Sequence, residues 1–434
     1  LSVDSENRPH ICYYDPSPGD LKYAYWNGSS WEIDLVDSKG DVGRYCSIDL
    51  DSKNIPHISY FDNTNKDLKY AYLNESSWVN QTVNYLGDVG YDSSIAIDSN
   101  DNIHICYYDH TKEVIYGLKY ATLKQSHVTW DIETIEENKG GSLSFKLNSF
   151  DKPGITIFDF YRNKTVKYLY RYGDRWQFKV PEFDPDTTFG QYTTSLAFDS
   201  NDNPHICYTN ENNRTLRYSY LKDNKWIIQT VDTKDDVGYV CSLKLDDYDN
   251  AHVCFETINN SNISINYGFF SNNKWNVLDV DEGRSPSMAL DKLNLPHISY
   301  IKNRTCYYAT SSIFLFSPNK NETLYKEDIY DIKWTTKKEN EEVRIDLYKD
   351  DNYYDTIVNK THNNSYSWKI AKDLEQGNYM LKIYDINNND IYASINFKIQ
   401  NKDIEMLDVT PFIILGFVLI FIIALLIFVL KKKK

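Results

Sequence analysis

Short segments of alternating apolar and polar residues run along most of the chain, and they recur in sets. The clearest segment reads Pro-His-Ile-Ser-Tyr-Phe-Asp at residues 56–62. Related segments occur seven times, and their His positions, with Gly154 replacing one His, lie 47, 47, 50, 51, 47 and 45 residues apart. The seven segments begin at Pro9, Pro56, Ile103, Pro153, Pro204, Ala251 and Pro296. A period of this length is typical of a repeat architecture.

Each repeat holds four segments that are rich in β-branched and aromatic residues and bounded by Asn, Asp, Ser and Gly. In the second repeat these are residues 47–51, 56–62, 68–72 and 78–83. The pattern predicts four short antiparallel strands joined by tight turns, such as the Asn-Gly turn at residues 27–28. Four such strands per repeat predict the blade of a β-propeller. A β-solenoid is the alternative, but its coils are usually shorter and need no hairpin inside each repeat.

A Trp opens the fourth segment of six repeats, and the seventh repeat has no such segment. The six residues are Trp31, Trp78, Trp130, Trp176, Trp226 and Trp275. Propellers complete their last blade with a strand from the other end of the chain, because an open sheet edge invites aggregation. We therefore expect a Trp-containing strand upstream of Leu1, together with an export signal.

The repeats resemble the Pro-His-Ile-Ser-Tyr-Tyr-Asp and Leu-Lys-Tyr-Ala repeats of secreted, anchored propeller proteins of archaea and bacteria. The resemblance covers residues 1–310 and implies a seven-bladed propeller without a defined activity.

Residues 313–399 break the period, and their alternation predicts a small β-sandwich of six or seven strands. Ser-Pro-Asn, Lys-Trp-Thr and Gly-Asn-Tyr segments within it resemble the immunoglobulin-like domains near the wall-synthesis proteins of yeast. That resemblance implies a stalk.

The segment Pro411–Leu430 has 20 residues without a charged or amide side chain, and four lysines follow it. A segment of this length and composition predicts a transmembrane helix, and the lysines place its C-terminal end in the cytoplasm. The protein is thus predicted to be a single-pass protein of the cell membrane with its N-terminal part outside. The predicted fold is all-β with one helix: a β-propeller at 1–310, an immunoglobulin-like sandwich at 313–399, a linker at 400–410, the transmembrane helix at 411–430 and a cytoplasmic tail at 431–434.

The charge balance of the chain restricts the classes of partner it can bind. The net charge is −15, and without the four terminal lysines 43 basic residues face 62 acidic ones, a net charge of −19. A domain this acidic is not expected to bind nucleic acid or an anionic membrane surface through a general field.

The repeated His could suggest metal or acid–base chemistry, but an enzyme needs one such set and not one in every blade. We therefore predict that each His makes a structural hydrogen bond to a nearby turn. His110, His127 and His362 stand outside the repeat and receive no role.

The seven cysteines are Cys12, Cys46, Cys106, Cys207, Cys241, Cys254 and Cys306. Four of them occupy one repeat position, where Ser59 and Ser299 stand in other blades, so they are predicted to be small buried residues. Their spacing matches no metal site. Cys241 and Cys254 lie on neighbouring predicted strands and are the best candidates for a disulfide.

Two further patterns point to ions and modification. Residues 98–102 and 199–203 carry oxygen ligands at alternate positions, like the start of a calcium loop, but they lack its Gly and distal Glu. Asx turns explain them equally well, so no metal or other cofactor is predicted and calcium stays the alternative. Glycosylation sequons occur at Asn27, Asn74, Asn80, Asn163, Asn213, Asn259, Asn262, Asn303, Asn321, Asn359 and Asn363.

Candidate ligand-binding residues lie in the loops that join one blade to the next. These loops read Gly-Asp-Val-Gly at residues 40–43 and 87–90 and Asp-Asp-Val-Gly at 235–238, and a Tyr follows each. Carboxylates accept sugar hydroxyls and Tyr rings stack on sugar rings, although ordinary turn chemistry would explain the loops as well. The candidates are Asp41, Tyr45, Asp88, Tyr91, Asp236 and Tyr239.

No nucleophile, zinc-helix, phosphate-loop or dinucleotide motif occurs, so no catalytic residue is predicted. The leading hypothesis is a cell-surface adhesion or recognition protein whose propeller binds an extracellular protein or carbohydrate. A carbohydrate-active hydrolase or lyase is the alternative, and it would need unrepeated carboxylates near the divergent fourth blade, around Asp159 to Asp186. A structural surface-coat component is the third hypothesis.

Overall fold

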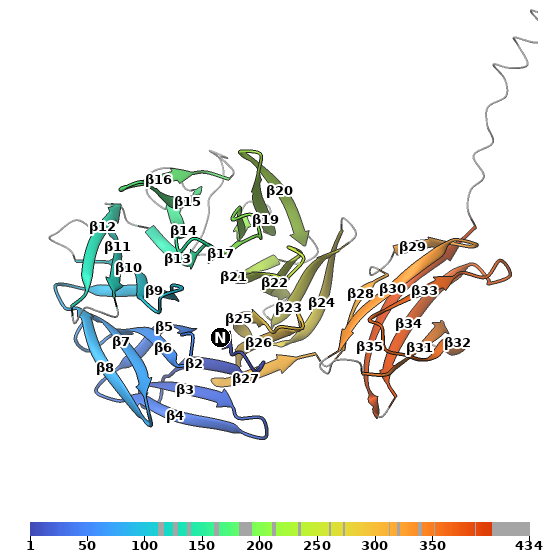
Figure 1. The fold of residues 1–434 in the computed structure, drawn as a ribbon, viewed down its shortest axis with the longest axis horizontal. Helices are drawn as coiled ribbons and strands as arrows, with labels where there is room; N and C mark the ends of the chain where they lie inside the picture. Colours follow the sequence, from blue (N-terminus) through green and yellow to red (C-terminus); the bar gives the residue numbers. More distant parts are fainter. Residues whose placement is uncertain are drawn as a thin grey trace, which may run out of the picture.

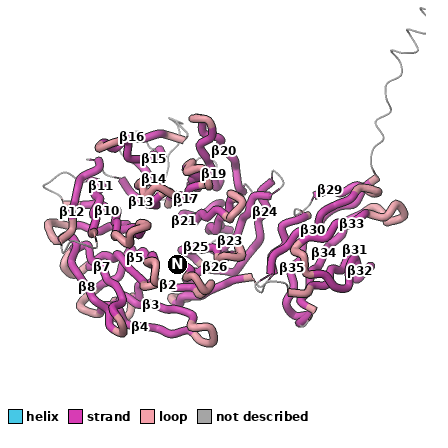
Figure 2. The backbone as a smooth tube through the Cα atoms, viewed as in Figure 1, coloured by secondary structure: helices cyan, strands magenta, loops and turns pink. Residues whose placement is uncertain are grey.

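A computed structural model places most of the chain, and all elements of the described part are strands (Figures 1 and 2). It describes residues 1–401 except 112–116, 125–128, 137–139, 160–164, 182–192, 211–213, 233–235, 260–261, 272–273, 312, 319–321, 337–340, 351 and 387. Within these ranges no helix is long and apolar enough to cross a membrane. The predicted membrane segment at 411–430 lies outside the described residues.

Seven small sheets form a ring (Figure 1). Six sheets have four antiparallel strands and the seventh has three, always in sequence order. Their strands are β1 (Ser2–Val3), β2 (Pro9–Asp15), β3 (Asp20–Trp26), β4 (Trp31–Asp37); β5 (Val42–Leu50), β6 (Pro56–Asp62), β7 (Asp67–Asn74), β8 (Ser77–Asn84); β9 (Val89–Ile97), β10 (Ile103–Asp109), β11 (Gly117–Leu123), β12 (Asp131–Glu136); β13 (Gly140–Leu147), β14 (Pro153–Asp159), β15 (Thr165–Tyr172), β16 (Arg175–Lys179); β17 (Thr194–Phe198), β18 (Pro204–Asn210), β19 (Thr215–Lys222), β20 (Lys225–Asp232); β21 (Asp236–Leu245), β22 (Ala251–Asn259), β23 (Asn262–Ser271), β24 (Lys274–Glu282); and β25 (Arg284–Leu290), β26 (Pro296–Lys302), β27 (Thr305–Thr310). The predicted β-propeller is thus present, and we call its sheets blades 1 to 7.

The Trp of each fourth strand packs edge-on against a Tyr from the third strand of the preceding blade. Trp78 meets Tyr23 with ring centroids 5.1 Å apart, and Trp31 of blade 1 meets Tyr308 of blade 7 at the same distance. The other pairs are Trp130–Tyr70, Trp176–Tyr120, Trp226–Tyr168 and Trp275–Tyr218. Edge-to-face aromatic pairs add about 1 kcal/mol each beyond their area burial. The Trp period therefore reports blade-to-blade packing, and one contact closes the ring.

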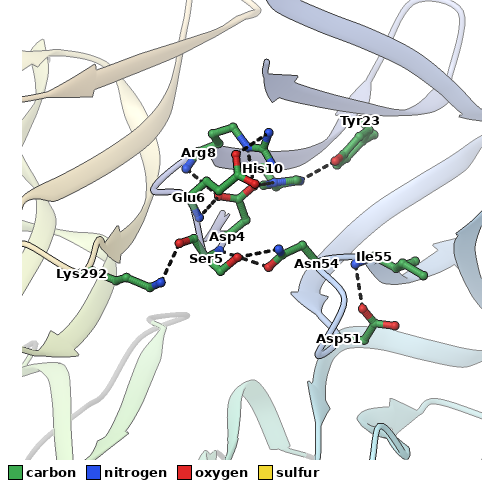
Figure 3. Close-up of polar contacts among 10 residues, drawn as sticks. All are labelled: Asp4, Ser5, Glu6, Arg8, His10, Tyr23, Asp51, Asn54, Ile55 and Lys292. Atoms are coloured by element: carbon green, nitrogen blue, oxygen red, sulfur yellow. Dashed lines mark hydrogen bonds and ion pairs between the residues drawn. The ribbon is translucent and has the colours of Figure 1, made fainter. Parts of the chain in front are cut away.

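The repeated His bonds to a Tyr of the third strand in all six blades that carry it, and in four of them its Nε2 also bonds to the Asp of the nearby turn, as predicted. Nε2 of His57 and of His205 lies 3.6 and 3.5 Å from the turn Asp without a hydrogen bond. In blade 1, Nδ1 of His10 lies 2.5 Å from the Tyr23 hydroxyl, and Nε2 lies 3.3 Å from the Asp4 carboxylate. The same Asp accepts the backbone N–H groups of Glu6 and Arg8 at 2.8 Å, so it holds the turn between the first two strands. Figure 3 shows this arrangement. The equivalent His–Tyr pairs are His57–Tyr70, His104–Tyr120, His205–Tyr218, His252–Tyr267 and His297–Tyr308.

The same turns also connect neighbouring blades. Each turn contains an Asn or Asp in the left-handed backbone region, and its side chain accepts a backbone N–H from the turn of the preceding blade. The pairs, donor first, are Ser5–Asn54, Ser52–Asp101, Ser99–Asp151, Ser149–Asp202, Ser200–Asp249, Asp247–Asn294 and Lys292–Asn7. The last pair closes the ring, and there Lys292 also reaches the Ser5 carbonyl at 2.6 Å (Figure 3).

The predicted pairing of Cys241 with Cys254 is wrong. Cys241 in β21 is bonded to Cys207 in β18 of the preceding blade, with Cα atoms 6.7 Å apart. In the register of β21 and β22, Cys241 lies opposite Phe255 while its neighbour Ser242 lies opposite Cys254. Because successive side chains point to opposite faces of a sheet, Cys241 and Cys254 face opposite ways.

A β-sandwich follows the propeller (Figure 1). Its two sheets enclose a core that includes Trp334, Leu347, Leu381 and Phe397. One sheet has the order β28-β30-β33 and the other β29-β35-β34-β31-β32. The strands are β28 (Ile313–Ser317), β29 (Glu322–Tyr325), β30 (Ile329–Thr336), β31 (Val343–Lys349), β32 (Asn352–Thr361), β33 (Ser365–Lys369), β34 (Gly377–Asp385) and β35 (Asn388–Gln400).

Candidate functional site

The innermost strands of several blades contain a β-bulge close to the loop that joins them to the preceding blade. In four of them a residue of the bulge adopts a positive φ, namely Tyr45 (53°), Asp92 (49°), Ser142 (53°) and Ser285 (56°). The strand pairing shifts register at each of these positions. Bulges re-aim side chains at the end of a strand, and a positive φ is uncommon for a residue as large as Tyr. The local backbone therefore sets the direction of the Tyr45 ring.

Asp41 ties the first blade-joining loop to its neighbours. Its carboxylate accepts hydrogen bonds from the Tyr14 hydroxyl (2.7 Å), Asn63 Nδ2 (2.7 Å) and Arg44 Nη2 (2.8 Å). Burial acts to raise the pKa of Asp41, but these bonds outweigh it and lower the pKa below its ordinary value. Asp41 is thus a charged anchor for Arg44 between blades 1 and 2, and its oxygens are already engaged by protein groups.

Tyr45 of blade 2 and Tyr91 of blade 3 belong to one aromatic surface. Their ring centroids are 5.7 Å apart. The ring centroid of Phe61 lies 4.4 Å from that of Tyr91, and His110 stacks on Tyr91 with ring centroids 4.3 Å apart and an interplanar angle of 23°. Phe61 is buried, whereas 47% of Tyr45 is exposed. We call Tyr45, Phe61, Tyr91 and His110 the aromatic platform.

Polar groups border the aromatic platform. Burial raises the pKa of Tyr91 to about 12, and the charge and hydrogen bond of Asp88 act in the same direction, so its hydroxyl stays protonated. Among the described residues, one buried oxygen of Asp88 has no hydrogen-bond partner. Asp92 accepts the Ser142 backbone N–H at 3.3 Å. The platform thus combines aromatic faces with carboxylate acceptors and a hydroxyl donor.

The six predicted ligand residues fall into two groups. Asp41, Tyr45, Asp88 and Tyr91 lie on the adjoining blades 2 and 3, or in the loops that lead into them. Asp236 and Tyr239 lie on β21 of blade 6, and their side chains are outside the described part of the chain.

Sequence reasoning missed Arg44, Phe61 and His110. His110 directly follows the second strand of its blade, and it seemed isolated because its stacking partner Tyr91 belongs to the first strand. Its place next to a repeated segment was the signal that could have found it.

Buried charges near the fourth blade bear on the enzyme hypothesis. Lys167 Nζ lies 2.7 Å from Asp159 and 2.9 Å from Glu136, and it is 2% exposed. Lys69 holds Asp37 in the same way at 2.6 Å between blades 1 and 2. The Asp159 cluster is therefore a version of a repeated contact between blades. Residues 160–164 and 182–192 lie outside the described residues.

The two calcium-like segments are turns of the inter-blade ring. Asp98 Oδ1 accepts the backbone N–H groups of Asn100 and Asn102 at 2.9 and 2.8 Å, and Asp199 does the same for Asn201 and Asn203. The described residues contain no group of three or more His, Cys, Asp or Glu side chains placed to hold a metal ion. Asx turns account for these segments.

Eight of the 11 sequon asparagines lie in the described residues, and all eight are exposed. They are Asn27, Asn74, Asn80, Asn259, Asn262, Asn303, Asn359 and Asn363. Asn163, Asn213 and Asn321 lie outside the described part. Glycosylation itself stays a prediction.

A hollow lies between the propeller and the sandwich. It has a volume of about 600 Å³, and Tyr248, Phe270, Lys292 and Trp334 are among its lining residues. Trp334 is buried, and its Nε1 has no partner among the described residues. This hollow is a competing location for a ligand.

Comparisons with known proteins add the following. No curated protein matches the chain. Among solved structures, AofleA from Arthrobotrys oligospora is 13% identical with a TM-score of 0.43, covering 64% of this chain and 87% of its own. The polysaccharide lyase Uly1 is 10% identical with a TM-score of 0.47 (70% and 88%), and the SapL1 lectin bound to α-methyl fucoside is 11% identical with a TM-score of 0.44 (64% and 94%).

One part of the chain matches a family model. Residues 317–399 match the Kre9/KNH-like N-terminal Ig-like domain, which supports the predicted resemblance of the sandwich to the yeast wall-synthesis proteins.

Proposed function

We propose that this chain is a cell-surface recognition protein whose propeller binds a neutral glycan at the aromatic platform. The half-exposed Tyr45 ring carries the proposal. Tyr45 has a left-handed backbone conformation, and its ring lies beside that of Tyr91. Sugar rings stack on exposed aromatic faces, and carboxylates at the border accept sugar hydroxyls. The enzyme hypothesis has no such support, because the buried carboxylates near blade 4 are bound by Lys167.

The charges around the platform favour a neutral ligand over an acidic one. Arg44, which precedes Tyr45, is paired with Asp41 at 2.8 Å. The Lys66 ammonium lies 5.5 Å from the Phe61 ring centroid and donates a hydrogen bond to Asn63. Asp88 lies beside Tyr91, and the whole chain carries −15. A uronic or sulfated polymer would be repelled by this surface, whereas a hydroxyl-rich neutral sugar would find acceptors.

The proposal includes the location of the protein. The apolar segment at 411–430 and its terminal lysines support a single membrane anchor with the propeller outside the cell. The sandwich would then hold the propeller away from the membrane, and exposed sequons would carry glycans.

A panel of neutral and acidic polysaccharides tests the proposed function. The full chain is expected to bind at least one neutral polymer, and Tyr45→Ala should weaken that binding about tenfold, as loss of one stacking contact worth about 1.4 kcal/mol implies. Titration with the polymer measures the affinity, and product analysis on the same samples detects turnover.

Tyr172→Ala is the matched control, because Tyr172 is 71% exposed at the tip of the β15–β16 hairpin. Its affinity should equal that of the unmodified chain. Binding that is lost on Tyr248→Ala but not on Tyr45→Ala would move the site to the hollow beside the sandwich. Turnover of any polymer would contradict a purely binding role.

A further inference from the structure

Like side chains face each other at one position of the boundary between blades. The position joins the second strand of one blade to the first strand of the next. Between blades 2 and 3 the hydroxyls of Ser59 and Ser93 are 3.0 Å apart, and between blades 4 and 5 those of Thr156 and Thr194 are 2.9 Å apart. All four residues are buried. These matched pairs link blades through side chains rather than through the strand ladder.

The disulfide occupies the same position between blades 5 and 6. Cys207 and Cys241 are 34 residues apart, as are Ser59 and Ser93. The register within each blade agrees. Ser93 directly precedes Ser94, which lies opposite Cys106, and Cys241 directly precedes Ser242, which lies opposite Cys254. The position therefore accepts a hydroxyl pair or a bonded pair of sulfurs.

Cys12 and Cys46 fill this position between blades 1 and 2. They too are 34 residues apart in the sequence, and Cys46 directly precedes Ser47, which lies opposite Ser59. Each of the two thiols shifts the pKa of the other. Both are half-buried and pack against the apolar cluster shared by the two blades.

The other two cysteines of the repeat position, Cys106 and Cys254, have no cysteine facing them in the next blade. The first-strand residue that follows Cys106 at the next boundary is Leu143, and the one that follows Cys254 is Pro286. Both cysteines are buried. The position thus separates cysteines that can pair from cysteines that cannot.

We propose that Cys12 and Cys46 form a second disulfide, which joins blades 1 and 2 as Cys207–Cys241 joins blades 5 and 6. A low-molecular-weight disulfide is the oxidant. Cys12 attacks one of its sulfurs as a thiolate, which forms a mixed disulfide and releases one small thiol; Cys46 then attacks Cys12 Sγ and releases the second. The protein loses two electrons and two protons as the Sγ–Sγ bond forms, and the small disulfide leaves as two thiols. The interaction between the two thiols lowers the pKa of Cys12 and raises that of Cys46, which favours Cys12 as the attacking sulfur.

A thiol count tests the proposal. The full chain is equilibrated with oxidised glutathione, denatured, alkylated and digested without reduction. With seven cysteines, two disulfides leave three thiols for alkylation, whereas Cys207–Cys241 alone leaves five. We expect three, and a peptide that links Cys12 to Cys46. Alkylation of both Cys12 and Cys46 in a chain that retains Cys207–Cys241 would overturn the proposal.

The double variant Cys12→Ser/Cys46→Ser is the matched control, because it copies the natural Ser59–Ser93 pair. It should fold and show three thiols both before and after oxidation. The single variant Cys46→Ser should show four, with Cys12 alkylated. If Cys12 instead links to a third cysteine in this variant or in the parent chain, the assignment of the pair is wrong.

Discussion

Replacing Gly43 with alanine is expected to destabilise the propeller by about 4 kcal/mol, since it combines backbone strain with a steric clash. Gly43 has a φ of +103°, which side-chain-bearing residues rarely adopt. A Cβ at this position would lie 2.8 Å from both Cα and Cβ of Leu21, a fully buried residue in the preceding blade. A backbone atom cannot give way as the end of a flexible side chain can. Gly90 repeats the geometry against Leu68 at 2.9 Å.

Gly28 separates the two causes. Its φ is +102°, but a Cβ there would meet nothing within 4 Å. Gly28→Ala should therefore cost only the strain, about 1–2 kcal/mol. Denaturant unfolding of the full chain, followed by circular dichroism, measures both variants. Equal losses at the two positions would show that blades 1 and 2 move apart at little cost.

The repeat made much of the propeller predictable from sequence. A structural role repeated from blade to blade imposes the same residue types at the same spacing, so the strands, the Trp that opens the fourth strand and the structural role of the repeated His could be inferred. The two glycines of the Gly-Asp-Val-Gly loops could also be identified from the repeated sequence. Their close approach to Leu21 and Leu68 was not, because it depends on how adjacent blades dock.

The details that sequence reasoning missed depend on register. A bulge shifts the pairing by one residue, and unlike residues, among them Tyr45 and Ser285, occupy the same repeat position in the four blades that adopt it. Such variety leaves no residue pattern to read. The disulfide shows the same problem: adjacency of strands suggested Cys254 as the partner of Cys241, whereas the facing of the side chains selects Cys207. Asp41 and Tyr45 were found as candidates, but only the structure distinguishes an anchor from an exposed ring.

The histidines of the turns are expected to make the propeller lose stability as the pH falls below about 6.5. Burial lowers the pKa of His10, His57, His104 and His205, even though a carboxylate beside each acts to raise it. In His10 and His104 a neutral ring with its proton on Nε2 suits the site, since it accepts from the Tyr hydroxyl and donates to the Asp. Above pH 6.5 the rings are neutral in both the folded and the unfolded chain, so they do not change the free energy of unfolding. Below pH 6.5 the unfolded chain binds protons that the folded chain does not, and this favours unfolding.

The size of this effect follows from linkage. Each ring removes at most about 1.4 kcal/mol of stability per pH unit between its unfolded and folded pKa. Four rings with partial shifts should together remove about 2–3 kcal/mol between pH 7 and 5.5. The carboxylates of Asp4, Asp98 and Asp199 do not interfere, because hydrogen bonds outweigh burial and keep their pKa values below the ordinary one.

Two variants assign the pH dependence to the turns. His205→Gln cannot gain a proton, so the slope of unfolding free energy against pH should decrease by the share of one ring in four. His362→Gln, at an exposed position of the sandwich, should leave the slope unchanged. Denaturant titrations at intervals from pH 7.5 to 5.5 give the slopes. A stability that is flat across this range, or equal slopes in His205→Gln and the parent chain, would mean that the buried rings already carry protons, held by their Asp partners.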